Sequence, residues 1–263
     1  MNATEVLQAF NAQVRQSTRP DGTGAVLEQA GPVVRRVADS TQDGPGGSGV
    51  FWSDLDQGSA GAVIAEQVEF FGGQGKMFEW KLYDYDQPAD LASLLLDAGF
   101  VPEEAEALML AEVTRVPQQV KLPDGVRLER VTDAAGIAAL TGLHEDVFGK
   151  DESGLRNALT EQLSAAPELI EMVVAMAGDQ PVCSARIEFV PGTQFAGLWG
   201  GGTLPQWRGR GIYRALVAYR AALAAGRGYR YLQVDASPDS RPILERIGFD
   251  CLAITTPYIW SPG

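Results

Sequence analysis

The chain has 263 residues, enough for two small domains or one large one, and its 45% apolar content allows a sizeable core. Its formal net charge of −13 argues against non-specific nucleic-acid binding, and its cysteines, Cys183 and Cys251, with the single histidine, His144, give neither a disulfide framework nor a histidine-based metal cluster. No apolar run approaches the ~20 residues of a membrane span and no signal-peptide pattern opens the chain, so we expect a cytoplasmic protein that binds neither metal, membrane nor nucleic acid.

The first 116 residues are predicted to alternate helices and strands. Val6, Phe10 and Val14 recur at helical spacing and indicate an amphipathic helix over 1–18. The other elements predicted in this half are strands over 33–37 and from 50, a helix over 60–71, a strand over 77–85 and a helix from 88 to 97.

The strand predicted over 77–85 alternates in character. Phe78, Trp80 and Leu82 fall on one side, and Lys81 and Tyr83 on the other. Phe78, Trp80 and Tyr83 are candidates to line a substrate pocket, but aromatic residues at strand spacing favour core packing, so we expect them to be buried.

The second half is predicted to form a mixed sheet with helices on both faces. Asp133 is an expected N-cap, and Gly226 and Gly228 an expected helix end. The predicted elements are strands over 126–131, 171–177, 182–190, 195–204 and 229–235, and helices from 133 towards 148, over 153–163, from 212 to 226 and from 240 to 247.

The two halves of the chain share a short pattern. Leu95-Leu96-Asp97-Ala98-Gly99-Phe100 parallels Leu244-Glu245-Arg246-Ile247-Gly248-Phe249, and an apolar strand-like segment follows each. We interpret this as an internal repeat with two domains, 1–116 and 126–263, joined by a proline-containing linker.

The run from Leu204 to Ile212 is the most informative motif. It places two glycines and two arginines between a predicted strand and the start of a helix, where free backbone N–H groups and the helix dipole favour a phosphate. A P-loop is absent, and the Rossmann pattern would need a glycine at Arg214. Gln206, Gly209 and Gly211 fit the pattern Q/R-x-x-G-x-G/A instead.

With this loop and the elements around it, the chain resembles the GNAT acyltransferase superfamily over about residues 126–263. The resemblance implies an α/β fold with a mixed, mostly antiparallel sheet flanked by helices, here in two related halves of which the N-terminal one is degenerate and lacks the loop. It also implies that acetyl-CoA is the co-substrate, with its pyrophosphate on the loop and its pantetheine along the strand edge. The implied cofactor-binding residues are Thr203, Leu204, Gln206, Arg208, Gly209, Arg210, Gly211, Ile212, Tyr213 and Ser237.

The acid and base are where this chain departs from the family. Many members carry a tyrosine proton donor four residues before the Gly-Phe pair, and Leu244 stands there. Glu188, Asp235 and Tyr258 are therefore the candidate catalytic residues, with Glu145 and His144 as weaker candidates for the base.

The favoured function is an acyl-CoA-dependent N-acetyltransferase that acts on a primary amine of a small molecule or peptide. The net charge of −13 favours a cationic acceptor through electrostatic steering. The alternative is a non-catalytic acyl-CoA-binding or regulatory protein, because the usual tyrosine is absent. A further possibility is an N-terminal half that serves only as a surface for homodimerisation.

Overall fold

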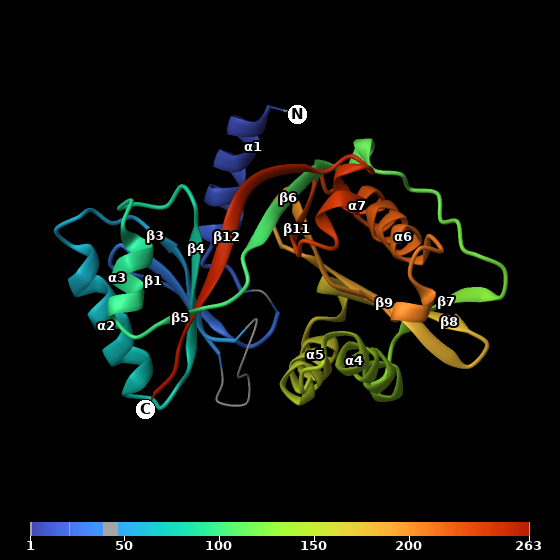
Figure 1. Ribbon diagram of the computed structural model, residues 1–263, viewed down its shortest axis with the longest axis horizontal. Coiled ribbons are helices and arrows are strands. Elements are labelled where there is room, and N and C mark those ends of the chain that lie inside the picture. Colours follow the sequence, from blue (N-terminus) through green and yellow to red (C-terminus); the bar gives the residue numbers. More distant parts are fainter. Residues whose placement is uncertain (1, 21, 39–46, 263) are drawn as a thin grey trace.

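The computed structural model describes residues 2–20, 22–38 and 47–262 (Figure 1). The N-terminal half contains α1 (Ala3–Phe10), β1 (Val26–Ala30), β2 (Val33–Val37), β3 (Gly49–Ser53), α2 (Ala60–Gly72), β4 (Phe78–Tyr83), α3 (Leu91–Asp97), β5 (Val101–Pro102) and β6 (Glu106–Glu112). The C-terminal half contains β7 (Val126–Val131), α4 (Ala134–Phe148), α5 (Ser153–Ala165), β8 (Ile170–Ala177), β9 (Gln180–Phe189), β10 (Phe195–Thr203), α6 (Ile212–Gly226), β11 (Tyr231–Ala236), α7 (Arg241–Glu245) and β12 (Asp250–Trp260).

The elements predicted from the sequence agree with these within a few residues, except at the N-terminus. The helix predicted over 1–18 is α1 followed by a π-helical turn, Asn11–Arg15. Val6 and Phe10 are buried as expected, and the Phe10 ring meets Phe195 edge-on, with 5.8 Å between the ring centroids.

One mixed, mostly antiparallel sheet runs through both halves in the order β1-β2-β3-β4-β12-β6-β11-β10-β9-β8-β7, with β5 paired to β12. The halves exchange their last strands: β12 pairs with β4 of the N-terminal half, and β6 pairs with β11 of the C-terminal half. In Figure 1 β12 crosses from one lobe to the other. Neither half therefore completes its sheet with its own strands.

The internal repeat is visible in the sheet. Each half has one parallel strand pair connected by a helix, β3-α2-β4 and β10-α6-β11. In each half a short helix and a Gly-Phe pair follow, and the strands that come next, β6 and β12, pair antiparallel with each other. The predicted two-half architecture is thus confirmed.

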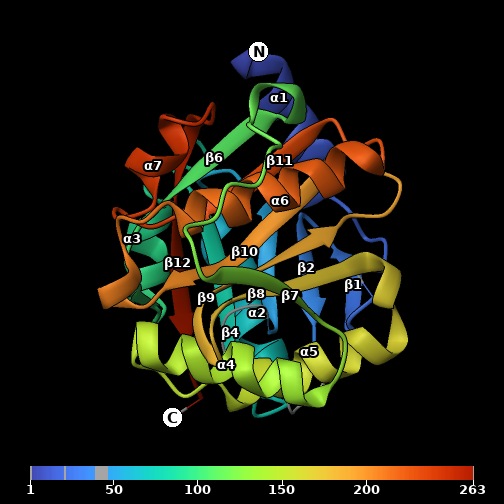
Figure 2. The ribbon, with the colours of Figure 1, turned by 90° about the vertical axis from the view of Figure 1, so that its right-hand side faces the viewer.

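Helices cover the C-terminal part of the sheet on both faces (Figure 2). Helices α4 and α5 pack on one face through a core that includes Ile137, Leu140 and Leu159. Helix α6 packs on the opposite face, where Leu216 and Val217 are completely buried. Because a sheet buried on both faces needs apolar residues on both, β8 reads as a continuous apolar run.

Helices α2 and α3 cover one face of the N-terminal part of the sheet, and α1 packs on the other face, against Tyr83 of β4. Phe78 and Trp80 of β4 lie in the core under α2 and α3, each 1% exposed, as predicted. The alternate residues Glu79, Lys81 and Tyr83 point to the other face, where a cleft separates the halves.

Candidate functional site

A cleft of about 1020 Å³ lies between the two halves and is lined by residues of both. Register explains which strand residues face it, because side chains alternate between the faces of a sheet. Lys81 of β4 is paired with Pro257 of β12, Thr255 of β12 with Glu106 of β6, and Asp235 of β11 with Leu108 of β6. The cleft is thus built from neighbouring strands that are distant in the sequence.

The predicted phosphate loop lies at the N-terminus of α6. Gly209 and Gly211 have φ of +74° and +83°, a left-handed conformation that side chains with a Cβ rarely adopt. Within the described chain, the backbone N–H groups of residues 209–214 have no acceptor. Arg208 and Arg210 are exposed beside them. These free donors, the positive end of the helix dipole and the two guanidinium groups together suit an anionic ligand.

The strands in front of this loop separate. β10 and β11 are hydrogen-bonded as a parallel pair only from Phe195 to Gly197, although both strands continue further. A bulge between Trp199 and Gly202 turns β10 away, with Gly200 at φ +58°. The Tyr213 ring lies against Gly201, where a Cβ would come within 2.8 Å of its Cε2. The three consecutive glycines therefore form a bulge, and their lack of a Cβ lets neighbouring side chains such as Tyr213 pack directly against the backbone.

The other predicted cofactor residues have different roles. Ile212 and Leu204 are buried and anchor the loop. The Leu204 N–H donates to the Val182 carbonyl at 3.0 Å, which corrects the expectation that it is free for pantetheine. The Thr203 carbonyl accepts from Arg208 Nε at 3.2 Å. Gln206 is exposed at the loop.

Two more of the predicted residues, Tyr213 and Ser237, line the cleft beside the separated strands. Burial raises the pKa of the Tyr213 phenol, so it stays protonated at neutral pH. The Ser237 Oγ lies 3.2 Å from the Ser240 Oγ.

The equivalent position in the N-terminal half is closed. The loop before α2 carries Asp56, whose Oδ1 accepts from the N–H groups of Gly58 and Ser59 at 2.9 and 2.8 Å. These hydrogen bonds, with one from the Ser59 hydroxyl, lower the pKa of Asp56. A carboxylate of the chain itself thus occupies the N–H groups that would otherwise meet a phosphate, which agrees with the prediction that this half is degenerate.

A cluster of charged side chains lies in the cleft where β4, β6 and β11 come together. Lys81 Nζ is 2.8 Å from Asp235 Oδ2 and 3.9 Å from Glu106 Oε2. The Asp235 side chain is only 2% exposed, and its Oδ1 has no partner among the described residues. Glu79 Oε1 is likewise buried without a hydrogen-bond partner there.

The environment of this cluster changes its protonation. Burial by itself lowers the pKa of Lys81, but the carboxylates of Asp235, Glu79 and Glu106 raise it by more. The net pKa lies well above the usual value for lysine, so Lys81 stays protonated. Burial raises the pKa of Glu106 to about 7, against the opposing effect of Lys81. A carboxylate with a pKa near 7 in a cleft is suited to general-base catalysis.

Of the catalytic candidates from the sequence, Asp235 and Glu188 line the cleft and Tyr258 does not. Glu188 Oε1 accepts from Arg186 Nε at 2.8 Å. Tyr258 points to the opposite face of β12 and packs in the core under α2 and α3, which makes it unavailable as a proton donor in the cleft.

The weaker candidates are structural. His144 is 3% exposed, and its Nε2 lies 2.9 Å from the Gly200 carbonyl, so it supports the bulge. Burial lowers its pKa, against that hydrogen bond. Glu145 pairs with Arg156 at 3.3 Å and does not line the cleft.

Glu79, Lys81 and Glu106 are the cleft residues that the sequence analysis missed. A signal was present, since Glu79 and Lys81 interrupt a strand that is otherwise aromatic and apolar. Charged residues in a strand are usually interpreted as solvent-exposed. Here Lys81 instead faces Asp235, which belongs to the other half of the chain.

Leu244 is completely buried, in the core beneath α6, and not in the cleft. We expect that Leu244→Tyr lowers the free energy of unfolding by about 1–3 kcal/mol, because a larger side chain overpacks the core. Urea unfolding monitored by circular dichroism measures this, and unchanged stability would show that the ring can turn into the cleft.

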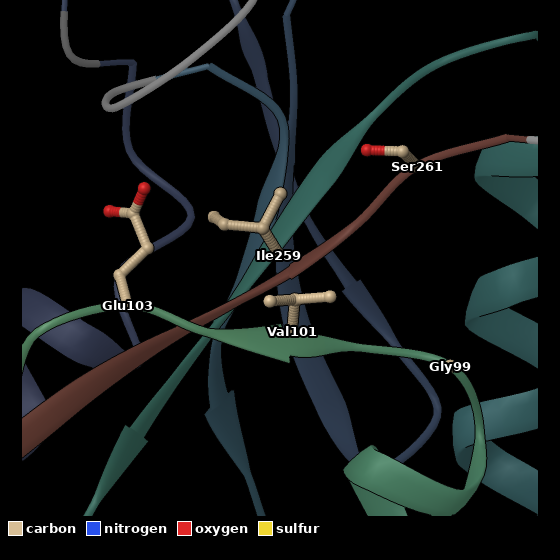
Figure 3. A pocket seen from close by; sticks show the side chains of 5 residues that line it. All are labelled: Gly99, Val101, Glu103, Ile259 and Ser261. Carbon is tan, nitrogen blue, oxygen red and sulfur yellow. The ribbon is translucent and has the colours of Figure 1, made fainter.

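A smaller pocket of about 310 Å³ lies next to the cleft on β5 and β12 (Figure 3). Val101 and Ile259 lie side by side at its floor, and the Glu103 side chain stands at one side. Glu103 and Ile259 also line the main cleft, so the small pocket extends its outer end.

The described residues contain no group of three or more His, Cys, Asp or Glu side chains arranged to hold a metal ion. Within the same residues, no helix combines the length and apolar character needed to cross a bilayer.

Comparison with known proteins supports the resemblance seen in the sequence. Residues 138–249 match the model of the acetyltransferase (GNAT) family. No curated protein matches the chain.

Solved structures resemble the whole chain. A GCN5-related N-acetyltransferase from Kribbella flavida is 19% identical with a TM-score of 0.70, over 100% of this chain and 96% of that one. A conserved protein of unknown function from Staphylococcus epidermidis is 13% identical with a TM-score of 0.69, over 92% and 96%. A tandem GNAT protein from the clavulanic acid biosynthesis pathway is 13% identical with a TM-score of 0.63, over 99% and 94%. These likenesses confirm the predicted fold class.

Proposed function

We propose that this chain, whose residues 138–249 match the model of the acetyltransferase (GNAT) family, transfers an acetyl group from acetyl-CoA to the primary amine of a cationic acceptor. The proposal depends on the gap that opens between β10 and β11 beyond Gly197, which we call the wedge. It ends at the backbone N–H groups of residues 209–214, which have no acceptor within the described chain. The diphosphate of CoA suits the donors at the helix start, and the wedge gives its extended arm a path to the cleft.

The reaction needs a base, because an ammonium group must lose a proton before its nitrogen attacks a thioester. Glu106 is our proposed base, since its pKa of about 7 lets it accept that proton at neutral pH. The neutral amine nitrogen then bonds to the acetyl carbon, the carbon–sulfur bond breaks and the thiolate leaves. The nitrogen loses its second proton in this step, and that proton replaces the one that the donor gives to the sulfur. The protonated phenol of Tyr213, at the cleft wall, is our proposed donor to that thiolate.

The cleft also supports a cationic acceptor. The lining as a whole carries Lys and Arg residues as well as carboxylates, but around Lys81 three carboxylates gather, those of Glu79, Glu106 and Asp235. A positive amine is attracted to such a surface, whereas an acidic acceptor would be repelled.

A second candidate function is acyl-CoA binding without catalysis, which the burial of Leu244 in place of the usual tyrosine favours. Release of free CoA thiol, measured with a panel of amines, separates the two. Tight acetyl-CoA binding with no thiol release from any amine would favour the binding protein.

The role of the loop in binding acetyl-CoA is tested with two side chains of the same size that differ in charge. We expect acetyl-CoA to raise the melting temperature of the wild type, because a ligand that binds only the native state stabilises it. Gly211→Asp should remove this shift, since a carboxylate repels the diphosphate, while Gly211→Asn, which has the same shape without the charge, should keep part of it. Both side chains meet open space at this position, and both bear the cost of its positive φ. An equal shift for the two variants would place the diphosphate elsewhere.

A further inference from the structure

The charged cluster in the cleft has an excess of negative groups. Lys81 is the cation at its centre, and the carboxylates of Asp235, Glu79 and Glu106 all act on it. Glu103 adds a further carboxylate that acts on Glu79 and Glu106. At the outer end of the cluster, Lys150 Nζ lies 3.8 Å from Glu103 Oε1, where both side chains are partly exposed. Four carboxylates therefore face two ammonium groups, of which only Lys81 is buried.

Two carboxylate oxygens in this cluster are buried without a partner in the described chain, Asp235 Oδ1 and Glu79 Oε1. The Asp235 side chain is 2% exposed, so it gains little from solvent water. A buried carboxylate oxygen without a donor is costly, and its presence at a cleft wall indicates that a ligand supplies the donor.

The two oxygens lie at different depths along the cleft. Asp235 contacts Lys81, and Glu79 is two residues further along β4, about 6–7 Å away at the spacing of a strand. The Asp235 end adjoins Glu106 and Ser237, next to the separated strands. The Glu79 end adjoins Ile259, where the small pocket opens and Glu103 stands at the side.

We propose that the acceptor is a linear diamine or polyamine, whose reacting amine lies beside Glu106 and Asp235 Oδ1, the oxygen that Lys81 leaves without a partner among the described residues, and whose second ammonium group lies beside Glu79 Oε1 and Glu103. The proposal rests on the proposed acetyl transfer, and it names the class of substrate. Three of the four carboxylates come from the N-terminal half, so this half contributes acceptor recognition although its own phosphate site is closed.

Binding should be coupled to protonation. Burial raises the pKa of Glu79, with Lys81 opposing this and Asp235 and Glu103 adding to it. An ammonium group beside Glu79 favours its charged form, so diamine binding should release protons. Calorimetry in two buffers with different ionisation enthalpies measures this release.

The test compares amines that differ by one charge. Butylamine and 1,4-diaminobutane are titrated calorimetrically into the full-length protein. We expect the diamine to bind at least tenfold more tightly, and Glu79→Gln or Glu103→Gln to remove most of that preference while butylamine affinity stays the same. Glu145→Gln is the control, since Glu145 does not line the cleft. Magnesium chloride serves as a competing cation.

Equal affinity for the two amines, a preference that survives in both variants, or displacement of the diamine by equimolar magnesium would overturn the proposal. These outcomes are separate from failure of the proposed function, which is seen as an absence of stabilisation by acetyl-CoA and of thiol release. If the protein binds the diamine through Glu79 but releases no CoA thiol, the proposed diamine site stands and the proposed acetyl transfer is wrong.

Discussion

Glu106→Gln should lower kcat by about 10²–10⁴-fold, the contribution that a general base typically makes. The amide cannot accept a proton from the acceptor, but it keeps the size of the side chain and its hydrogen-bonding capacity. Thiol release from acetyl-CoA with 1,4-diaminobutane measures the effect. Glu112→Gln, at the other end of the same strand and outside the cleft lining, is the matched control.

The pH profile separates a base from a binding residue. Burial raises the pKa of Glu106 to about 7; Lys81 lowers it, and Asp235, Glu79 and Glu103 raise it further. The carboxylate must be deprotonated to act, so kcat/KM should rise with pH and show an inflection near 7 in the wild type. Glu106→Gln should lack this inflection. A variant that keeps both the rate and the inflection would move the base to Asp235 or Glu188.

Lys81→Met should lower the free energy of unfolding by about 3–5 kcal/mol at neutral pH, because it leaves buried carboxylates without their cation. Lys81 and Asp235 are 13% and 2% exposed, so solvent compensates little. Burial raises the pKa of Glu79 and Lys81 opposes this rise, so in the variant the folded-state pKa of Glu79 lies further above its unfolded value. The loss of stability should therefore shrink as the pH falls and Glu79 is protonated. Urea unfolding at pH 5 and pH 7.5 measures the difference.

The double variant Lys81→Met with Asp235→Asn is the control for this explanation. It removes the uncompensated charge together with the cation, and most of the lost stability should return. If Lys81→Met alone is as stable as the wild type at pH 7.5, water must reach the cluster and the pair is no longer a buried one.

The same cluster shows why the N-terminal half could not be interpreted from its own residues. It has lost a phosphate site, because Asp56 occupies the N–H groups at the start of α2. It nevertheless supplies Glu79, Lys81 and Glu106 to a cleft whose proposed acetyl-CoA end belongs to the other half. A degenerate repeat can thus keep the acceptor side of a site.

The local features of this protein could be predicted from its amino-acid sequence. The spacing of apolar residues placed the helices and strands, and Gly209 and Gly211 marked the loop before α6, since helical periodicity and turn chemistry depend on residues a few positions apart. The matching Gly-Phe pairs likewise predicted the repeat, because they end equivalent helices.

Which charged side chains come into contact depends on the tertiary structure. Strand exchange through β6 and β12 brings Lys81 to Asp235 and turns Tyr258 into the core, away from the cleft. No periodicity encodes such a pairing, because the register between strands from different halves is fixed by packing over the whole sheet. The loop proposed to bind the acyl donor could therefore be predicted from the sequence, whereas the proposed acceptor site forms only when the two halves fold together.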